Sequence, residues 1–490
     1  MPSTSIESAA VDGRARTPRF IQRQLANLHK AITTDAKIIQ DAIVADTGAK
    51  LREAQLEIHL SISVVKELYD NFSVEEALSQ EYRVARGQDW CDRNDAVGTI
   101  YLRPQSQNLV YSIVSPLANA IAAGNCVVIE SNKPHQALSS KIAEIILQHL
   151  DRDTIAFVEN LPEPPSKGVL LIDQTGEIPK INASSIHTPG SSARVVALVD
   201  RSSDIVSAAS SIVQARTAFG GNSVYAPDIV LVNEFAMKEF VQAAKIALSI
   251  SIEETKGQDI TASQATCKIA GIGLTEKELR GSGANVVMRG DLGTIAIVED
   301  RGSSLLQRKI YGACLILHSV RSLDDGIDLA NLQYGTVAPR NKTLLACYHF
   351  GAPEAAKYTT QFIDSYASFV NHAPIELTVG PAAPIGFHPS ATHRYRPAMF
   401  SVPKADCIAG DSASRSLASI FRAEAKAWSD VYEKQITSSL APTRQKAGKV
   451  VGFFDQGLIT GFVVFWVPVI ASAVVGSGYG IRAGIRMTRS

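Results

Sequence analysis

A chain of 490 residues is long enough for two or more domains with sizeable cores. Its 48 basic and 48 acidic residues cancel, so the overall charge gives no reason to expect nucleic-acid binding. The six cysteines form no CxxC pair, which argues against a zinc cluster or a disulfide framework and favours a reducing, cytosolic compartment for the folded part.

Residues 1–17 contain no apolar stretch of the kind that a signal peptide needs, and their polarity predicts a disordered segment. Apolar residues at helical spacing then predict helices over 18–46 and 51–72. Strands are expected at 97–102 and 126–130, and helices at 110–123 and 136–150. Strand and helix alternate at the spacing of a doubly wound parallel sheet.

The middle of the chain contains the motif Gly221-Asn222-Ser223-Val224-Tyr225-Ala226-Pro227-Asp228. It lies between a helix-like run over 205–219 and a strand-like run over 229–232, and its composition predicts a tight turn into a strand.

The C-terminal region changes character. Residues 411–439 have the pattern of an amphipathic helix, and a basic linker follows over 441–449. No charged residue occurs between Asp455 and Arg482. This stretch is long enough for a helix that spans a membrane, which needs roughly 20 predominantly apolar residues. Pro468 is compatible with a transmembrane helix. We therefore expect a membrane anchor near 456–481, with a buried core helix or an amphipathic cover as the alternative.

Several segments, in order, resemble the aldehyde dehydrogenases, most closely their class three (fatty aldehyde) branch. The most specific is Pro-Leu-Ala-Asn-Ala-Ile-Ala-Ala-Gly-Asn over 116–125; the others lie at 197–204, 221–228, 308–314, 369–372 and 383–387. The resemblance covers about residues 18–405. It implies an α/β fold of two doubly wound parallel-sheet domains, to which this chain adds a C-terminal apolar helix. Some fungal biosynthetic gene clusters encode proteins of this kind.

The resemblance also implies a division of the chain into parts. A disordered N-terminus (1–17) precedes an NAD-binding-like domain (18–190) and a catalytic-like domain (191–370). Return strands for dimerisation (371–405), an amphipathic helix with a basic linker (406–449), and a transmembrane anchor with its tail (450–490) complete the chain.

When this sequence is aligned with the family's motifs, three catalytic positions carry a different residue. The nucleophilic cysteine falls on Val224, which cannot attack a carbonyl. The asparagine that holds the oxyanion falls on Gln107, or on Asn108 if the register slips by one. The general base falls on Gly190, which cannot take a proton. Ser223 is best interpreted as a turn hydroxyl, and Asp204 and Glu177 are acids nearby in sequence that nothing places in a cleft.

The cofactor positions are altered as well. The family's ribose-binding lysine becomes Glu130, and the ribose-binding glutamate becomes Lys309. The turn that meets the pyrophosphate falls on Thr175 and Gly176, where the acidic Glu177 would repel phosphate. No cofactor and no metal are therefore expected. Glu130 and Lys309 either meet across an emptied cleft or point separately into water.

Three interpretations follow. The first is a membrane-tethered, homodimeric pseudoenzyme that binds a partner protein or an apolar small molecule, with its folded domains in the cytosol and its anchor in a membrane such as the endoplasmic reticulum. The second is a divergent aldehyde dehydrogenase that oxidises an apolar aldehyde, fatty or from secondary metabolism, with NAD(P). The third is a serine hydrolase, although no Gly-x-Ser-x-Gly motif occurs in the folded region. His187 and His372 are the histidines to inspect.

Overall fold

The computed structural model describes residues 2–162, 168–176, 185–190, 192–256, 274, 276–290, 292–331, 343–387, 393–408, 425–442 and 452–487. The chain divides into two compact units, Met1–Ile408 and Ala409–Ser490, and each is described by itself.

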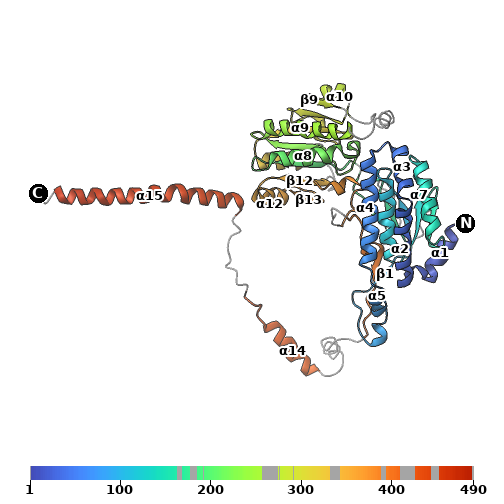
Figure 1. The fold of residues 1–490 in the computed structure, drawn as a ribbon. Helices are drawn as coiled ribbons and strands as arrows, with labels where there is room; N and C mark the ends of the chain where they lie inside the picture. The colour runs from blue at the N-terminus through green and yellow to red at the C-terminus, as the bar shows by residue number, and fades with distance from the viewer. Residues whose placement is uncertain are drawn as a thin grey trace. The chain divides into compact units, whose positions relative to one another are not determined.

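The first sheet in the chain has five parallel strands in the order β4-β3-β2-β5-β6 (Figure 1). The chain enters at β2, moves outward through β3 and β4, and then returns to the other side of β2 for β5 and β6. The order therefore reverses between β2 and β5, which is where open α/β sheets bind ligands, outside the carboxyl ends of their strands. The strands are β2 (Thr99–Arg103), β3 (Cys126–Glu130), β4 (Ile155–Val158), β5 (Val169–Asp173) and β6 (Ser185–His187).

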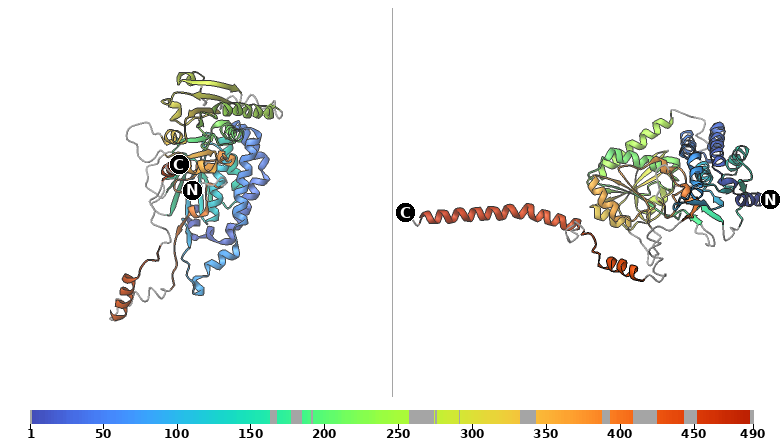
Figure 2. Two further views of the ribbon diagram at one scale, coloured as in Figure 1. Left: turned by 90° about the vertical axis from the view of Figure 1, so that its left-hand side faces the viewer. Right: turned by 90° about the horizontal axis from the view of Figure 1, so that it is seen from below.

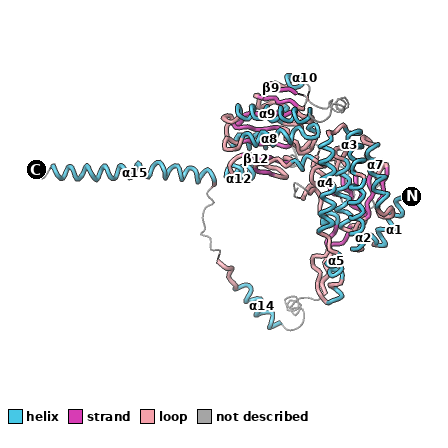
Figure 3. Tube along the Cα trace, viewed as in Figure 1, coloured by secondary structure: helices cyan, strands magenta, loops and turns pink. Residues whose placement is uncertain are grey.

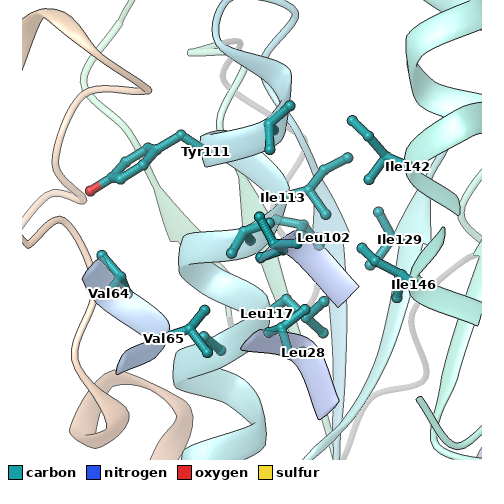
Figure 4. Close-up of a cluster of buried hydrophobic side chains, with 14 of the residues drawn as sticks. Leu28, Val64, Val65, Leu102, Tyr111, Ile113, Leu117, Ile129, Ile142 and Ile146 are labelled. Atoms are coloured by element: carbon teal, nitrogen blue, oxygen red, sulfur yellow. The ribbon is translucent and has the colours of Figure 1, made fainter. Parts of the chain in front are cut away.

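Five helices cover one face of this sheet (Figure 1). The helices over 109–122 and 136–149 make the main contacts with the strands, and the other three helices pack on these two. Residues such as Leu28, Val65, Leu117 and Ile146 meet Leu102 in a single core (Figure 4). The expected helix over 18–46 is broken at Asp35. The helices are α2 (Pro18–Thr34), α3 (Ala36–Thr47), α4 (Leu51–Asp70), α6 (Leu109–Ala122) and α7 (Gln136–His149).

The N-terminal segment is folded, so the expectation of disorder over 1–17 is wrong. Residues Pro2–Asp12 form α1, and a short 3-10 turn, Arg14–Arg16, follows. Ile6 and Ala9 are buried against the face of the five-stranded sheet opposite the helical layer, beside Tyr101 and Val128. The connections from β4 to β5 (159–168) and from β5 to β6 (174–184) are shorter than the dozen or more residues of a usual helical crossover, and α1 supplies apolar cover on this face instead.

The second sheet has seven strands in the order β13-β12-β7-β8-β11-β10-β9, all parallel to their neighbours except β9, which runs antiparallel to β10. Figures 2 and 3 show this sheet with its helices beside it. Helices α8 and α9 pack on one face, and α10, α11 and α12 on the other. The strands are β7 (Val195–Val199), β8 (Ile229–Asn233), β9 (Ala284–Gly290), β10 (Gly293–Val298), β11 (Cys314–Val320), β12 (Ala346–Phe350) and β13 (Ser368–Val370). The helices are α8 (Ile205–Thr217), α9 (Met237–Lys256), α10 (Glu276–Gly281), α11 (Leu323–Asn331) and α12 (Pro353–Phe362).

A two-stranded ribbon joins β1 (Asn94–Ala96) to β14 (Ser401–Pro403), and α5 (Val74–Glu81) precedes it in the chain. The two larger sheets fall on either side of residue 190, while the expected division into domains at 190, 370 and 405 stays a prediction.

The second unit contains two helices in its described residues. Helix α14 (Ala425–Thr437) covers part of the expected 411–439 helix, and residues 411–424 of that prediction lie outside the described residues. Helix α15 (Phe453–Met487) contains a 24-residue stretch, Asp455–Gly478, with a mean hydropathy of 2.4. By length and composition it can cross a membrane.

Candidate active site and cofactor cleft

One short segment connects the three places where catalytic residues were expected. The backbone N–H of Gly380 donates to Asn108 Oδ1 at 3.1 Å, and that of Ala383 donates to Tyr225 Oη at 2.9 Å. The N–H of Ile385 donates to the carbonyl of His187 at 2.9 Å. Asn108 adjoins Gln107, Tyr225 adjoins Val224, and His187 lies three residues before Gly190. The structure therefore brings the three segments together around residues 380–385.

Helix α4 holds two of these segments with carboxylates one turn apart. Glu53 Oε1 accepts the N–H of Phe219, at the start of the turn that leads to Val224, at 2.8 Å. Glu57 accepts the N–H of Val110 at 2.9 Å and Asn108 Nδ2 at 3.4 Å, which caps the N-terminus of α6. Burial raises the pKa of Glu57 to about 7, and the hydrogen bonds that it accepts only partly oppose this.

The turn at the nucleophile position is well built, but its chemistry is changed. Gly221 has φ 74°, and a Cβ there would lie 2.3 Å from the backbone of Gly312, so only glycine fits. The half-buried Val224 packs against the core of the seven-stranded sheet. Ser223 Oγ accepts the N–H of Tyr225 at 3.3 Å, as a turn hydroxyl does.

None of the described cysteines lies in the turn over 221–228. Cys126, Cys314 and Cys347 are buried on strands, and burial raises the pKa of Cys126 and of Cys314 to about 11. Cys91 and Cys407 are exposed on the ribbon of β1 and β14, which is a separate part of the fold. Cys267 lies outside the described residues.

Lys309 is turned inward toward the nucleophile turn. Its Nζ donates to the carbonyl of Val224 at 2.6 Å and to Asp228 Oδ2 at 3.0 Å, and its side chain is only 5% exposed. Burial lowers the pKa of Lys309, and the charge of Asp228 opposes that effect. Asp228 is fully buried and also accepts the N–H groups of Val195 and Ile310.

Arg216 completes this buried cluster. Its guanidinium lies 3.5 Å from Asp228 Oδ1 and donates to the carbonyls of Ile310, Pro227 and Gly312. Two cations thus share one carboxylate, and backbone groups make many of the other hydrogen bonds of these three side chains. The buried Nε of Arg216 has no hydrogen-bond partner among the described residues. The charge of Asp228 is needed here because an unpaired buried charge is strongly destabilising.

The residues expected at the oxyanion and base positions, Gln107 and Gly190, differ in burial. Gln107 Nε2 is buried and has no hydrogen-bond partner among the described residues, whereas Asn108 is fully engaged with Glu57 and Gly380. Gly190 is exposed, and a Cβ there would meet only Ser192 Oγ at 3.9 Å, so a side chain would fit. Asp204 caps α8 by accepting the N–H of Ser207, and Glu177 lies outside the described residues.

At the carboxyl edge of the five-stranded sheet, charged side chains end neighbouring strands. Arg103 Nε donates to Glu130 Oε2 at 2.7 Å, and Arg103 Nη1 donates to Asp173 Oδ2 at 3.1 Å. Burial acts to lower the pKa of Arg103, but the bonds and charges of the two acids outweigh it and the pKa is raised. Asp173 also accepts the N–H and hydroxyl of Thr175, which Gly176 follows. The pair Arg103–Asp173 therefore lies at the point where the strand order reverses.

Glu130 and Lys309 do not form the pair considered from the sequence, nor do they point separately into water. Glu130 binds Arg103 and Lys309 binds Asp228, in different clusters. Two carboxylates accompany the single arginine at this edge of the sheet, and the ammonium group of Lys309 is engaged by Val224 and Asp228. Among the described residues, no group of three or more histidine, cysteine, aspartate or glutamate side chains could hold a metal ion.

The two histidines singled out from the sequence have local roles. His187 Nε2 lies 2.5 Å from Ser185 Oγ on the same strand, and its Nδ1 has no partner among the described residues. His372 Nδ1 lies 2.8 Å from the carbonyl of Val370 in an exposed turn. Neither is placed beside Ser223 by any hydrogen bond of the described residues, so the serine-hydrolase interpretation gains no support.

The comparison with known proteins agrees with this architecture. Residues 7–338 match the model of the aldehyde dehydrogenase family. This chain belongs to the aldehyde dehydrogenase family. The α/β fold with two parallel sheets and an apolar C-terminal helix, expected from the resemblance, is thereby confirmed.

The relatives include members of the class three branch. The chain is 25% identical over 376 residues to aldehyde dehydrogenase family 3 member B1 of Bos taurus, covering 70% of this chain and 76% of that protein. It is 25% identical over 342 residues to the dimeric NADP-preferring aldehyde dehydrogenase of Canis lupus familiaris (65% and 75%). It is 23% identical over 373 residues to beta-apo-4'-carotenal oxygenase of Gibberella fujikuroi (68% and 68%).

Solved structures share the fold at low identity. The substrate-bound AldH of Staphylococcus aureus has a TM-score of 0.64 at 17% identity, covering 84% of this chain and 94% of that one. The glyceraldehyde-3-phosphate dehydrogenase of Methanocaldococcus jannaschii complexed with NADP has a TM-score of 0.63 at 13% identity, covering 84% and 93%.

Sequence reasoning missed Arg103, Asp173 and Glu57. A signal existed for the first two, because each charged residue directly follows an apolar strand of a parallel sheet, and such strand ends meet at one edge. Glu57 carried no comparable signal, since a glutamate on an amphipathic helix is ordinarily at its solvated face.

Proposed function

We propose that this aldehyde dehydrogenase family member does not carry out the thiolate-dependent oxidation of aldehydes, and that it acts as a membrane-tethered binding protein for an apolar small molecule or a protein partner. The observation that carries the proposal is the position of Lys309. Its ammonium group is fixed against the carbonyl of Val224, at the turn where the family's nucleophile is expected, and Asp228 holds it there.

The other substitutions also argue against catalysis and against cofactor binding. A valine cannot form the covalent intermediate, a glycine at 190 cannot activate water, and the cluster of Arg103, Glu130 and Asp173 leaves net negative charge where a dinucleotide's phosphates would lie. In a different covalent enzyme, loss of the nucleophile alone lowers kcat by on the order of 10⁶. We therefore expect neither turnover nor tight NAD(P) binding.

The test is NAD(P)H formation by the purified full chain with long-chain and aromatic aldehydes, together with calorimetric titration of NAD and NADP. We expect no signal that scales with protein concentration. The variant Val224→Cys should remain inactive, because the base and the cofactor contacts are still missing. Steady NADH formation by the parent protein would overturn the proposal.

A second candidate function is oxidation of an apolar aldehyde, fatty or from secondary metabolism, by a divergent mechanism. The family match and the similarity to an enzyme named as a carotenal oxygenase favour it. Clear micromolar binding of NAD or NADP in the same titration would support this candidate over the first.

Two further features belong to the proposal. The 24-residue apolar stretch of α15 supports anchoring in a membrane, with residues 1–408 in the cytosol and the endoplasmic reticulum as our choice of membrane. Loss of carbonate-resistant pelleting on truncation after Lys449 would test it. The similarity to a relative named as dimeric supports a homodimer, which light scattering in detergent would check.

A further inference from the structure

Two exposed cysteines lie beside each other on the ribbon formed by residues 89–96 and 401–408. Trp90 and Asp406 exchange both backbone hydrogen bonds there, at 2.8 and 2.9 Å. Cys91 and Cys407 each follow one residue of this bridge, and both are exposed. The two thiols are therefore brought to one place by backbone pairing between segments that are far apart in sequence.

Because the pairing is antiparallel, Cys91 and Cys407 lie on opposite sides of the bridge along the ribbon and form a diagonal pair on one of its faces. Beyond the Trp90–Asp406 bridge, the next pairing joins Asn94 to Pro403, so residues 91–93 lie opposite residues 404–405 only. An extra residue on one strand bends and twists a ribbon. The hydrogen bond and charge of Cys91 raise the pKa of the Cys407 thiol.

The ribbon holds its shape without help from the thiols. Arg93 binds Asp95 at 2.8 Å and also pairs with Asp406, while Lys404 binds Asp95 at 3.1 Å. The N–H of Ile408 donates to Asp89 Oδ1 at 2.8 Å, beyond the cysteines. Because these contacts fix both flanks, one thiol meets the other at a high effective concentration. The remaining described cysteines, Cys126, Cys314 and Cys347, are buried.

We propose that Cys91 and Cys407 are a thiol oxidation site that forms a reversible intramolecular disulfide with a peroxide as oxidant. One thiolate attacks a peroxide oxygen, which gives a sulfenic acid and, after protonation, one water. The second thiol displaces the sulfenic oxygen as a second water, and the S–S bond forms. One hydrogen peroxide is reduced to two waters as two thiols are oxidised to one disulfide.

The position of the two cysteines in the chain determines what the disulfide would connect. Cys407 precedes Ile408, the last residue of the first compact unit, from which the chain continues toward the apolar helix. The disulfide would fasten this exit point covalently to the segment that begins at Asp89. Reduction would leave it held by the backbone bridge and the ion pairs alone.

The test is peptide mapping of the full chain in detergent after treatment with hydrogen peroxide and blocking of free thiols. Trypsin cleaves after Arg86, Arg93, Lys404 and Arg415, so the two cysteines fall in peptides 87–93 and 405–415. We expect these peptides to appear as one disulfide-linked species that dithiothreitol separates. Either Cys91→Ser or Cys407→Ser should abolish it.

A second measurement separates this site from two independently reactive thiols. In the parent protein, a sulfenic acid formed on either residue is consumed by its neighbour, so dimedone labelling should be low. In Cys91→Ser the sulfenic acid on Cys407 has no partner, and labelling should rise several-fold at the same peroxide dose. Equal labelling of parent and variant, or linkage of two chains through Cys91 or Cys407, would overturn the proposal.

Discussion

The five-stranded sheet at its carboxyl edge and the seven-stranded sheet at its amino edge each carry an arginine paired with carboxylate, yet the two clusters differ in burial. In the five-stranded sheet, Arg103 is 36% exposed and binds the partly exposed Glu130 and the buried Asp173. In the seven-stranded region, Arg216 and Lys309 surround an Asp228 with no exposure at all. Exposed pairs contribute little and can be exchanged cheaply, whereas a buried cluster must be complete. The fold therefore depends on the lysine at position 309 for its stability, and it does not depend in this way on the glutamate at position 130.

The largest expected effect comes from removing the shared carboxylate of the buried cluster. Asp228→Ala leaves Arg216 and Lys309 without a counter-charge and should lower the free energy of unfolding by about 3–5 kcal/mol. Asp173→Ala at the other edge should cost only about 1–3 kcal/mol, because Arg103 keeps Glu130 and reaches water. Urea unfolding of both variants measures the difference. Equal losses of unfolding free energy would show that the two clusters do not differ in their contribution to stability.

The two regions should also respond to pH with opposite sign. The pKa of Glu57 is about 7 in the folded state against 4.5 ordinarily, so the folded state binds this proton more tightly. Its contribution is complete below 4.5 and is lost as pH rises through 7, by about 3 kcal/mol. Burial lowers the pKa of His349, on β12, from 6.5 to about 4, so its contribution is lost as pH falls.

Substitution separates the two contributions. Glu57→Gln should remove most of the loss of stability between about pH 5 and about pH 8, and His349→Gln should remove the loss on the acidic side. The measurement is the unfolding free energy of each variant across this range. An unchanged slope in Glu57→Gln would show that the carboxyl group of residue 57 is ionised in the folded protein.

A third contrast concerns how each sheet is covered. Helices that follow strands cover both faces of the seven-stranded sheet, whereas one face of the five-stranded sheet is covered by α1. Ile6→Ala should therefore destabilise the protein by about 2–4 kcal/mol, because Ile6 is fully buried. Val11→Ala in the same helix, at a position 87% exposed, is the matched control and should change stability by less than about 0.5 kcal/mol. Similar small effects would mean that α1 does not cover the sheet.

The smallest expected effect is at the exposed edge. Glu130→Gln removes one partner of Arg103 but leaves Asp173, so the loss should be about 0–1 kcal/mol. The same variant should not gain NAD binding, since Asp173 and the inward Lys309 remain. Calorimetry and urea unfolding of one preparation give both results, and a gain in NAD affinity would identify Glu130 as the residue that excludes the cofactor.

The elements with strong local patterns were predictable from the sequence. The strand over 126–130 was placed with its observed bounds, and the helices over 110–123 and 136–150 to within a residue at each end, because their apolar spacing is regular. The helix over 18–46 was placed but not its break, since Asp35 is tolerated inside a helix as well as at its end. Helix α1 was missed because only contact with the sheet distinguishes Ile6 and Ala9 from a polar tail.

In the candidate site, too, some features were predictable from the sequence and others were not. The positions of Val224, Gln107 and Gly190 followed from motifs, and the structure brings their segments together. The partners of the substituted charges could not be predicted, because they depend on which neighbour is closer in three dimensions. Lys309 turns to Asp228, 81 residues away, and Glu130 turns to Arg103, 27 residues away. Neither spacing is a local pattern.

The bonds made by residues 380–385 bear on the order in which the molecule assembles. The N–H of Gly380 reaches a residue 272 positions earlier, and that of Ala383 reaches one 158 positions earlier. Contacts of such sequence separation form late, because the entropy of closing the loops opposes them until local structure exists. During synthesis, the two sheets can acquire most of their strands before this segment leaves the ribosome. The three hydrogen bonds of residues 380–385 can therefore form only after nearly four-fifths of the chain has been made.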